Sequence, residues 1–132
     1  MNDLLHDNSI VFTNKGTKIY EGGFKEGRKN GIGVNYNEDF TKVIYRGCWA
    51  LDMKDGYGVL YGDNGFKKYQ GYWEYDSYHG KGIEYHDNGF KRYKGNWEGG
   101  ELDGHVYEYS TEGVLVKQSY WRWDQCYNSH YY

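Results

Sequence analysis

A repeat of about 24 residues constrains this chain more than any other feature. Four blocks start with Tyr, have Gly two residues later and a large ring after two more residues, and begin at intervals of 25, 24 and 24 residues. They occupy residues 20–24, 45–49, 69–73 and 93–97. Seven residues beyond each ring, a second element starts with Gly at positions 31, 56, 80 and 104. Such a period is typical of folds that stack one small unit on the next.

Both elements alternate with a period of two, which is the pattern of β-strands. In the first, the Tyr and the later ring share one side, and the intervening positions are mostly polar: Glu21, Arg46, Cys48, Gln70, Lys94 and Asn96. In the second, the residues that share a side are Val34 and Tyr36, Val59 and Tyr61, Ile83 and Tyr85, and Tyr107 and Tyr109. Whether these two apolar sets point to the same side of the sheet depends on whether the loop between them has an odd or even number of residues, which the sequence leaves open. Burial favours placing both sets on the same side.

Turn residues join these strands into hairpins. Gly27, Asp52, Asp76 and Gly100 share one loop position, and both residue types tolerate a left-handed backbone. The segments 63–65 and 87–89, both Asp-Asn-Gly, predict hairpin turns between copies. We therefore predict a half repeat (10–19), full repeats (20–44, 45–68, 69–92 and 93–116) and a half repeat (117–123), giving ten strands. Residues 1–9 are expected to be loosely ordered, and 124–132 to form a tail or cap.

Aromatic side chains must supply most of the buried apolar surface. Leu, Ile, Val and Phe make up only 23 of the 132 residues, whereas there are 17 Tyr, 5 Trp and 20 Gly, and the net charge is -3. Disordered chains have few aromatics and a large net charge, so this chain is expected to fold. Glycine inside a strand marks a close approach, which predicts rings lying across bare backbone. The fold class is all-β: an elongated single-layer antiparallel sheet of stacked hairpins, with no helix of 12 or more residues to cover its aromatic face.

Several function classes are excluded or disfavoured. The pI of 5.9 argues against a nucleic-acid binder, and no apolar run approaches the length of a membrane span. Cys48 and Cys126 are too few and too far apart for a disulfide framework or a zinc site. With no secretory signal in the sequence, we expect an intracellular, cytoplasmic protein with free thiols.

Catalysis is not expected either. Three histidines lie near aspartates: the first shares a turn position of the repeat, the second directly precedes an Asp-Asn-Gly turn, and no nucleophile-base or metal-ligand spacing recurs among them. They are His79, His86 and His105, near Asp76, Asp87 and Asp103. We predict no enzyme activity, no cofactor and no metal.

The pattern Tyr-x-Gly-x-(Trp/Phe)-x-x-Gly-x-x-x-Gly-x-Gly resembles the MORN repeat (membrane occupation and recognition nexus). Residues 20–33 fit it position by position, and the resemblance covers about residues 10–121. Asp52 and Asp76 depart from it by replacing the loop Gly, and Val106 by replacing the second Gly of the fourth copy. The resemblance implies a grooved sheet of stacked hairpins that acts as a non-catalytic recognition or scaffolding module. It also implies protein partners, often helical segments laid in the groove, self-association, and contact with membranes and phospholipids.

Two surfaces are therefore predicted to bind partners. The first is a groove floored by rings, although these rings also pack on one another: Tyr20, Phe24, Tyr45, Trp49, Tyr69, Trp73, Tyr93, Trp97, Tyr61, Tyr85 and Tyr109. The second is a stripe for an anionic partner, formed by Lys67, Lys68, Lys91 and Arg92, although basic residues near strand ends more often protect sheet edges.

The function that follows is a protein-interaction or scaffold module that binds a protein segment in the aromatic groove. Each half copy leaves an unpaired edge, so we also expect a homodimer formed through an end strand. The alternative is a peripheral membrane module that binds anionic phospholipid through the lysine stripe. These hypotheses place the protein in the cytoplasm, at the membrane periphery or on the cytoskeleton.

Overall fold

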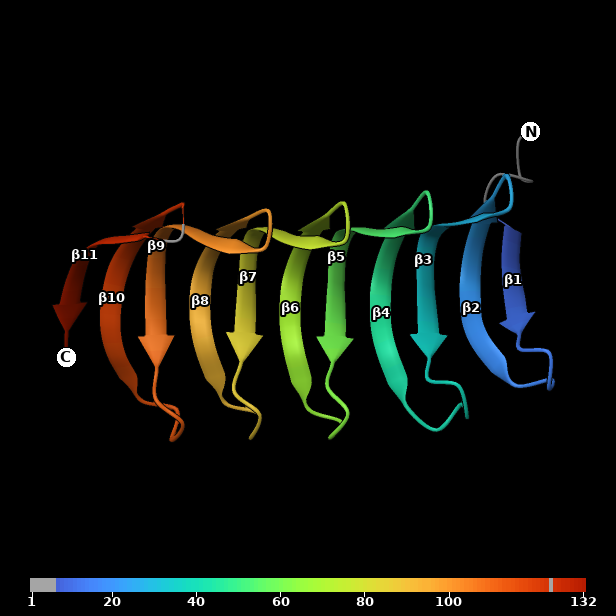
Figure 1. Cartoon of the computed structure of the whole chain (residues 1–132), viewed down its shortest axis with the longest axis horizontal. Helices are drawn as coiled ribbons and strands as arrows, with labels where there is room; N and C mark the ends of the chain where they lie inside the picture. Colours follow the sequence, from blue (N-terminus) through green and yellow to red (C-terminus); the bar gives the residue numbers. More distant parts are fainter. Residues whose placement is uncertain (1–6, 124) are drawn as a thin grey trace.

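The computed structural model describes residues 7–123 and 125–132, which form one antiparallel sheet with no helix. The strands follow one another in chain order, so each pairs only with its neighbours in sequence (Figure 1). They are β1 (Asp7–Phe12), β2 (Lys18–Lys25), β3 (Arg28–Tyr36), β4 (Val43–Ala50), β5 (Met53–Tyr61), β6 (Lys67–Glu74), β7 (Ser77–Tyr85), β8 (Lys91–Glu98), β9 (Glu101–Tyr109), β10 (Leu115–Arg122) and β11 (Gln125–Tyr131). The predicted fold class, a single-layer antiparallel sheet of stacked hairpins, is confirmed.

Two kinds of turn join the strands, one kind at the upper ends of the strands and the other at their lower ends (Figure 1). We call these two rows of strand ends the upper edge and the lower edge. At the upper edge, two-residue turns connect the strands of one copy, and both residues have positive φ, as in Leu51 (52°) and Asp52 (68°). Positive φ at both positions is the type I′ turn, whose twist matches that of paired strands. At the lower edge, Gly65 and Gly89 have φ of 86° and 93°. The predicted turn positions are therefore confirmed.

Asp52 and Asp76, which replace the loop Gly of the repeat, bond to the preceding copy. The Asp52 carboxylate accepts a hydrogen bond from the backbone N–H of Lys29, and the Asp76 carboxylate accepts one from Lys54, both at 2.7 Å. Asp also tolerates the left-handed backbone of this turn position. The two side chains thus connect consecutive hairpins along the upper edge.

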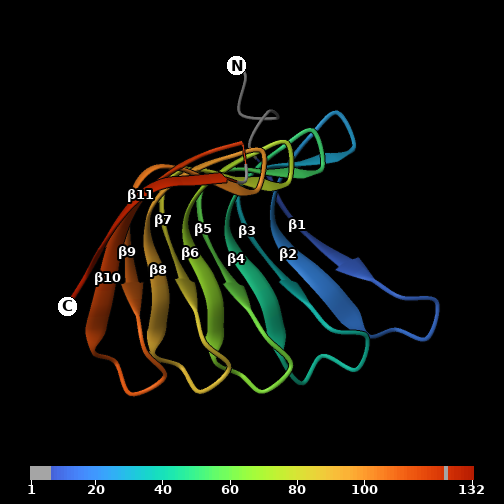
Figure 2. The same ribbon diagram turned by 60° about the vertical axis from the view of Figure 1, so that its left-hand side comes forward.

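The strands bend near their upper ends (Figure 2), and a line of paired glycines crosses the sheet. A Cβ added to Gly33 would lie 2.0 Å from the hydroxyl oxygen of Tyr20, and one added to Gly22 would lie 2.3 Å from the Cα of Gly33. These positions therefore have no room for a side chain. The line consists of Gly22, Gly33, Gly47, Gly58, Gly71, Gly82 and Gly95, one from each strand of β2 to β8.

Another glycine in each copy lies in a β-bulge at the bend. From Gly22 to Phe24, β2 advances by two residues, while β3 covers the four-residue step between Gly33 and Lys29. Gly31 lies within this bulge with a φ of 88°, which glycine adopts without steric cost. In Gly-x-Gly, the first glycine therefore shapes the bulge, and the second makes room for a ring.

Tyrosine and tryptophan rings fill the inside of the bend. The ring of Trp49 lies 5.0 Å from that of Tyr45 and 5.7 Å from that of Tyr20, both edge to face. Trp73 repeats this arrangement against Tyr69 and Tyr45, at 5.1 and 5.5 Å. Edge-to-face pairs add about 0.5–1.5 kcal/mol to what burial contributes. We call this ring-bearing side the inner face and the opposite side the outer face.

The apolar residues of the second strands point to the outer face, so the prediction that both apolar sets share one side is wrong. Tyr20 pairs directly with Asn35, and residues paired across two strands point to the same side. Val34 and Tyr36, which flank Asn35, therefore point away from Tyr20. The two-residue turn determines which residues of β3 point to the same side as those of β2. The bulge does not change this, because it adds two residues to β3, and an even number leaves the alternation of sides the same.

The fourth copy packs differently, as its departure from the repeat suggested. Val106 stands where the other copies have the second Gly, and its side chain is fully buried. It fills the space over which the Tyr of the copy would lie. Tyr93 is accordingly only half-buried, and its ring lies 6.4 Å from that of Trp97.

Both ends of the sheet extend further than predicted. β1 begins at Asp7, so residues 7–9, expected to be loosely ordered, pair with β2; residues 1–6 lie outside the described part. The segment expected to be a tail or cap contains β11, which pairs with β10 from Lys117 opposite Tyr131 to Arg122 opposite Gln125. The described residues therefore form a sheet of eleven strands instead of ten.

Candidate functional site

The inner-face rings predicted to floor a groove form the core of the protein. The Tyr20, Tyr45 and Tyr69 side chains are at most 1% exposed, and Trp49, Trp73 and Trp97 are 4–6% exposed. Phe24 and Tyr93 are half-buried and pack against this cluster. Rings buried to this degree offer little contact area to a partner.

The core hydroxyls act as structural hydrogen-bond donors. Burial raises the pKa of Tyr20 to about 12, with a smaller effect from the charge of Asp52, and burial also raises the pKa of Tyr45 and Tyr69 well above the ordinary range. The protonated hydroxyl of Tyr45 donates to the carbonyl of Cys48 at 3.1 Å, and that of Tyr69 donates to Tyr72 at 2.9 Å. These groups therefore hold the bend and do not supply acid-base chemistry.

Side chains at one position of the second strands cover the core rings. The ammonium group of Lys29 lies 4.7 Å from the ring centroid of Trp49, and that of Lys54 lies 5.4 Å from Trp73, within cation-π range. In the third copy, Tyr78 takes this position and stacks on Tyr69 at 3.8 Å. The inner face is thus largely covered by the protein's own side chains.

The other three residues of the predicted groove lie on the outer face. Leu60 and Glu84 pair with inner-face tyrosines, so their neighbours Tyr61 and Tyr85 point outward. Tyr109 occupies the same register position in the next copy, and all three tyrosines are half-buried. The eleven predicted residues therefore divide into eight on the inner face and three on the outer face, and they do not form one surface.

The outer face carries a hollow of about 420 Å³ over strands β5 to β9. Its floor includes the bare backbone of Gly71, Gly82 and Gly95. The side chains around it come from alternate positions of neighbouring strands: Tyr57, Gln70, Tyr72, Lys81, Ile83, Lys94, Asn96, His105 and Tyr107. We call this feature the outer hollow.

One wall of the outer hollow is held by a hydrogen-bond network around Gln70. Its amide nitrogen donates to the Tyr57 hydroxyl at 2.7 Å, and its amide oxygen accepts from Tyr85 at 3.2 Å and from Lys67 at 2.8 Å. The Tyr57 ring also packs edge to face on Tyr72, at 5.4 Å. This wall is therefore ordered without a ligand.

The opposite wall is centred on His105. An imidazole nitrogen, Nε2, lies 2.7 Å from the side-chain oxygen of Gln118, and the ring stacks on Tyr120 at 5.1 Å and contacts Tyr107 at 4.7 Å. The Gln118 amide in turn donates to the hydroxyl of Tyr132, beyond β11. The C-terminal segment thus supports this side of the outer hollow.

Sequence reasoning did not identify the outer hollow, although a signal for it exists. The residue after the first glycine of Gly-x-Gly changes from copy to copy: Ile32, Tyr57, Lys81 and His105, the last of which is followed by Val106 instead of Gly. A large side chain between two glycines has no close neighbours in its own strand. Such a position on an uncovered face is therefore exposed and free to vary.

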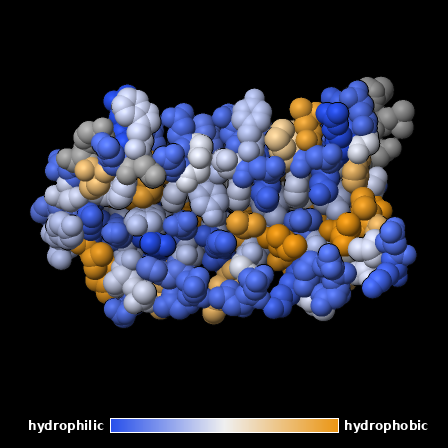
Figure 3. Space-filling view, in the orientation of Figure 1, coloured by the Kyte–Doolittle hydropathy of each residue, from blue (hydrophilic) through white to orange (hydrophobic). Residues whose placement is uncertain are grey.

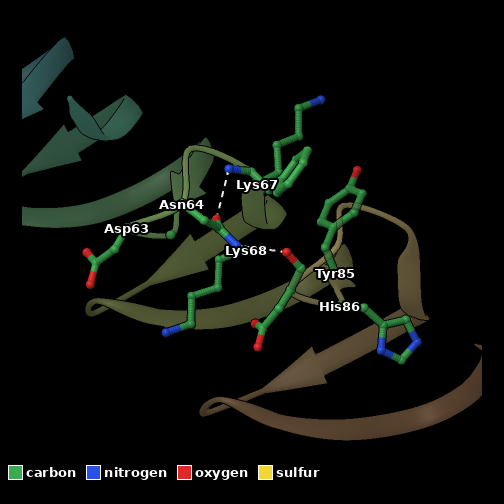
Figure 4. Close-up of a pocket in the computed structure, with 9 residues that line it drawn as sticks. Asp63, Asn64, Lys67, Lys68, Tyr85 and His86 are labelled. Atoms are coloured by element: carbon green, nitrogen blue, oxygen red, sulfur yellow. Dashed lines mark hydrogen bonds between the residues drawn. The ribbon is translucent and has the colours of Figure 1, made fainter. Parts of the chain in front are cut away.

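A smaller pocket of about 280 Å³ lies between two lower-edge loops and includes part of the predicted lysine stripe (Figure 4). Lys67 and Lys68 point in opposite directions, and Asp63 lies in the same pocket (Figure 4). Asn64 joins the loops by donating to the carbonyl of Asp87 at 2.7 Å. The basic residues therefore do not form one continuous row.

The second pair of the stripe is divided in the same way. The Lys91 ammonium lies 5.7 Å from the ring of Tyr109 on the outer face. Burial raises the pKa of the inner-face Glu84, and the charges of Arg92 and Lys68 partly offset this rise, so these two basic residues lie near the inner face. The four basic residues are thus shared between both faces of the sheet.

The remaining surface is mixed. In Figure 3, hydrophobic side chains form separate groups among hydrophilic ones, larger over the N-terminal strands than over the middle of the sheet. Within residues 7–123 and 125–132, no group of three or more His, Cys, Asp or Glu side chains could hold a metal ion. The same residues include no helix long and apolar enough to span a membrane.

No protein-family model matches the chain, and no curated protein matches it.

Proposed function

We propose that this chain is a MORN-type repeat protein that acts as a non-catalytic protein-interaction module and binds its partner in the outer hollow. The observation that carries the proposal is the contrast between the two faces. The inner rings are used as the core, whereas Tyr57 and Tyr72 on the outer face are 45% and 49% exposed. Uncovered aromatic surface next to polar groups is typical of interaction sites.

The dimensions of the outer hollow suit a protein segment. Tyr72 on β6 and Tyr107 on β9 stand three strand spacings apart, roughly 14 Å at about 4.8 Å per spacing. An α-helix with its side chains is about 10–12 Å across, and an extended segment is narrower. Because both walls are already ordered, binding loses less side-chain entropy.

The proposal retains a protein partner but moves its contact surface from the inner rings to the outer hollow. Tyr and Trp remain the residues that make efficient contacts, but only exposed rings can do so. The division of the basic stripe between two faces, with Asp63 and Asp87 in the lower-edge pocket, gives the phospholipid alternative no comparable support.

A capture experiment tests this proposal. Immobilised protein, its Tyr72→Ala/Tyr107→Ala variant and the control Tyr75→Ala/Tyr131→Ala are exposed to the same lysate, and captured proteins are compared by mass spectrometry. The control side chains are 70% and 69% exposed but lie outside the outer hollow. A captured protein is then purified and titrated by calorimetry. We expect the Tyr72/Tyr107 variant to bind at least about tenfold more weakly.

Equal binding by the wild type and the Tyr72/Tyr107 variant would overturn the proposal, provided that their circular dichroism spectra agree. Failure of any purified protein to bind directly would also overturn it. Self-association is a separate question, because β1 and β11 are the end strands of an open sheet. Light scattering over a concentration series measures it, and we expect a dimer formed through an end strand.

A further inference from the structure

We infer that the outer hollow binds a carboxylate-bearing peptide segment, with the acidic group between Lys81 and Lys94 and an apolar side chain on Ile83. The inference rests on the proposed function, because it names the chemistry of the partner at the same site. It follows from the charges lining the outer hollow, from the polar groups still available there, and from the position of Ile83.

The charges are the first argument. The described residues that line the outer hollow include Lys81 and Lys94 but no Asp or Glu, although the chain as a whole has a net charge of -3. Lys81 pairs with Asn96, and Ile83 pairs with Lys94, so the two lysines are diagonal neighbours on β7 and β8. Diagonal residues lie about 7–8 Å apart. A carboxylate between them would relieve the repulsion of two like charges.

No acidic side chain of the described protein neutralises this pair. The ion pairs found within residues 7–123 and 125–132 join Lys54 to Asp76 and His79 to Glu74, and neither includes Lys81 or Lys94. Both lysines are exposed, so a ligand can reach them. Opposite charge on a partner would therefore improve both the rate and the specificity of binding.

The hydrogen-bonding groups available to a ligand are mainly donors. The amide of Gln70 is engaged with Tyr57, Tyr85 and Lys67, and Nε2 of His105 is engaged with Gln118. The two lysine ammonium groups, by contrast, carry three N–H donors each and no acceptor. A ligand rich in acceptors fits this set, and charge-assisted bonds from ammonium to carboxylate are the stronger kind.

The lysine pair occurs at only one of the junctions between neighbouring copies, that of β7 with β8. The positions equivalent to Lys81 hold Ile32, Tyr57 and His105. The positions equivalent to Lys94 are Glu21, Arg46, Gln70 and Gln118. A uniform backbone therefore presents this cationic pair at a single place, as a specific site requires.

Ile83 adds an apolar requirement. It is half-buried, lies directly across from Lys94 and lines the same hollow. In an extended peptide, residues i and i+2 point to the same side, and successive residues advance about 3.3 Å. A segment of the form acidic-x-apolar can thus place its carboxylate between Lys81 and Lys94 and its apolar side chain at Ile83. An acidic saccharide would lack the apolar group.

Selection from a random peptide library provides the probe. Phage displaying randomised nine-residue peptides are selected on the wild-type protein, and enriched sequences are read. We expect Asp or Glu two residues from Leu, Ile, Phe or Trp. The most enriched peptide, labelled with fluorescein, is then titrated by anisotropy against the wild type and variants.

The variants separate charge at the site from overall charge. Lys81→Ala/Lys94→Ala is expected to weaken binding at least about tenfold, and Lys81→Arg/Lys94→Arg to stay within about threefold of the wild type. The control Lys15→Ala/Lys25→Ala removes the same charge from residues outside the outer hollow and is expected to change binding less than about twofold. Ile83→Ala is expected to weaken binding without changing its salt dependence.

Several results would overturn the inference: no enriched peptide, enriched peptides that are neutral or basic, or equal binding by wild type and Lys81→Ala/Lys94→Ala. A heparin-derived octasaccharide that binds through these lysines, when no peptide does, would assign the site to an acidic saccharide instead. Loss of binding in Tyr72→Ala/Tyr107→Ala with no effect of the lysines would reject the inference and retain the proposed function. Peptide binding that needs neither pair would reject both.

Discussion

The hydroxyl of Tyr45 lies across Gly58, so closely that a Cβ added to Gly58 would be 1.9 Å from the hydroxyl oxygen. The same overlap recurs between Tyr69 and Gly82, at 1.9 Å. Each of these tyrosines is fully buried and bonded to a backbone carbonyl, so it has no space into which to move. The contact between ring and bare backbone is therefore the central packing unit of the repeat.

Gly58→Ala is expected to destabilise the protein strongly, by more than about 2 kcal/mol, because the added methyl overlaps a ring that cannot shift. The control is Gly62→Ala, whose Cβ would lie 3.2 Å from the side-chain oxygen of Asn64 and 3.7 Å from the carbonyl oxygen of Phe66, with no overlap as close as that at Gly58. That variant is expected to cost less than about 1 kcal/mol. Urea denaturation measures both. Equal stability of the two variants would contradict the packing described for Tyr45.

Asp76 is expected to tolerate Gly better than Ala. Both variants lose the hydrogen bond from the Lys54 N–H and the ion pair with the Lys54 ammonium, but Asp76→Ala keeps a Cβ at a φ of 65° whereas Asp76→Gly removes it. The left-handed backbone costs a non-glycine residue about 1–2 kcal/mol. The free energy of unfolding should therefore be lower for Ala than for Gly by about this amount. A thermal or urea series that ranked Ala above Gly would refute this account of the turn.

The protein is expected to lose stability above pH 10. Burial raises the pKa of Tyr20 and of Tyr78 to about 12, above the value of 10.0 of a free tyrosine. Between these values the unfolded chain binds fewer protons than the folded one, so the free energy of unfolding falls as pH rises. The stabilisation is complete below pH 10 and is lost as pH approaches 12. Denaturation at fixed pH steps measures it.

Tyr78→Phe serves as the control for this pH dependence, because it keeps the ring that stacks on Tyr69 and removes the titrating hydroxyl. Its free energy of unfolding is expected to decline less steeply above pH 10 than that of the wild type. Identical slopes would show that Tyr78 does not contribute.

Tyr75→Asn is expected to stabilise the protein by about 0.5 kcal/mol. Tyr75 is the first residue of a type I′ turn, with a φ of 50°, and is 70% exposed. Asn is favoured at this position because it tolerates the left-handed backbone. The same substitution at Tyr120, which is 53% exposed but lies in β10, should lower stability instead. Melting temperatures of the two variants test the sign of each change.

The local repeat pattern was sufficient to predict most of the fold. Alternation with a period of two gave the strands, and the Gly and Asp positions gave the turns, because both depend on residues close together in the chain. β11 was missed because Gln125–Tyr131 lacks the repeat pattern. It forms by pairing with the edge of β10, which is a property of the assembled sheet.

The site depended more on tertiary structure. Sequence reasoning grouped Tyr61 and Tyr85 with Tyr45 and Tyr69, but strand register places the two pairs on opposite faces. It also treated exposed and buried rings alike, because a ring's exposure depends on which neighbours cover it. The outer hollow joins residues of five strands, so its shape and charge appear only when these strands are aligned.

The sequence by itself determined that this protein is a stack of hairpins in which aromatic rings pack over glycines, because the spacing of the repeat and the sizes of its residues require this arrangement. Only the tertiary structure decided which face the rings fill, where the sheet ends and which side chains meet in the outer hollow. The physical reason is that strand pairing brings together residues that are distant in the chain, such as Tyr57 opposite Tyr72 and Lys81 opposite Asn96, which all line the outer hollow. Their meeting depends on register and bulges, which no single repeat encodes.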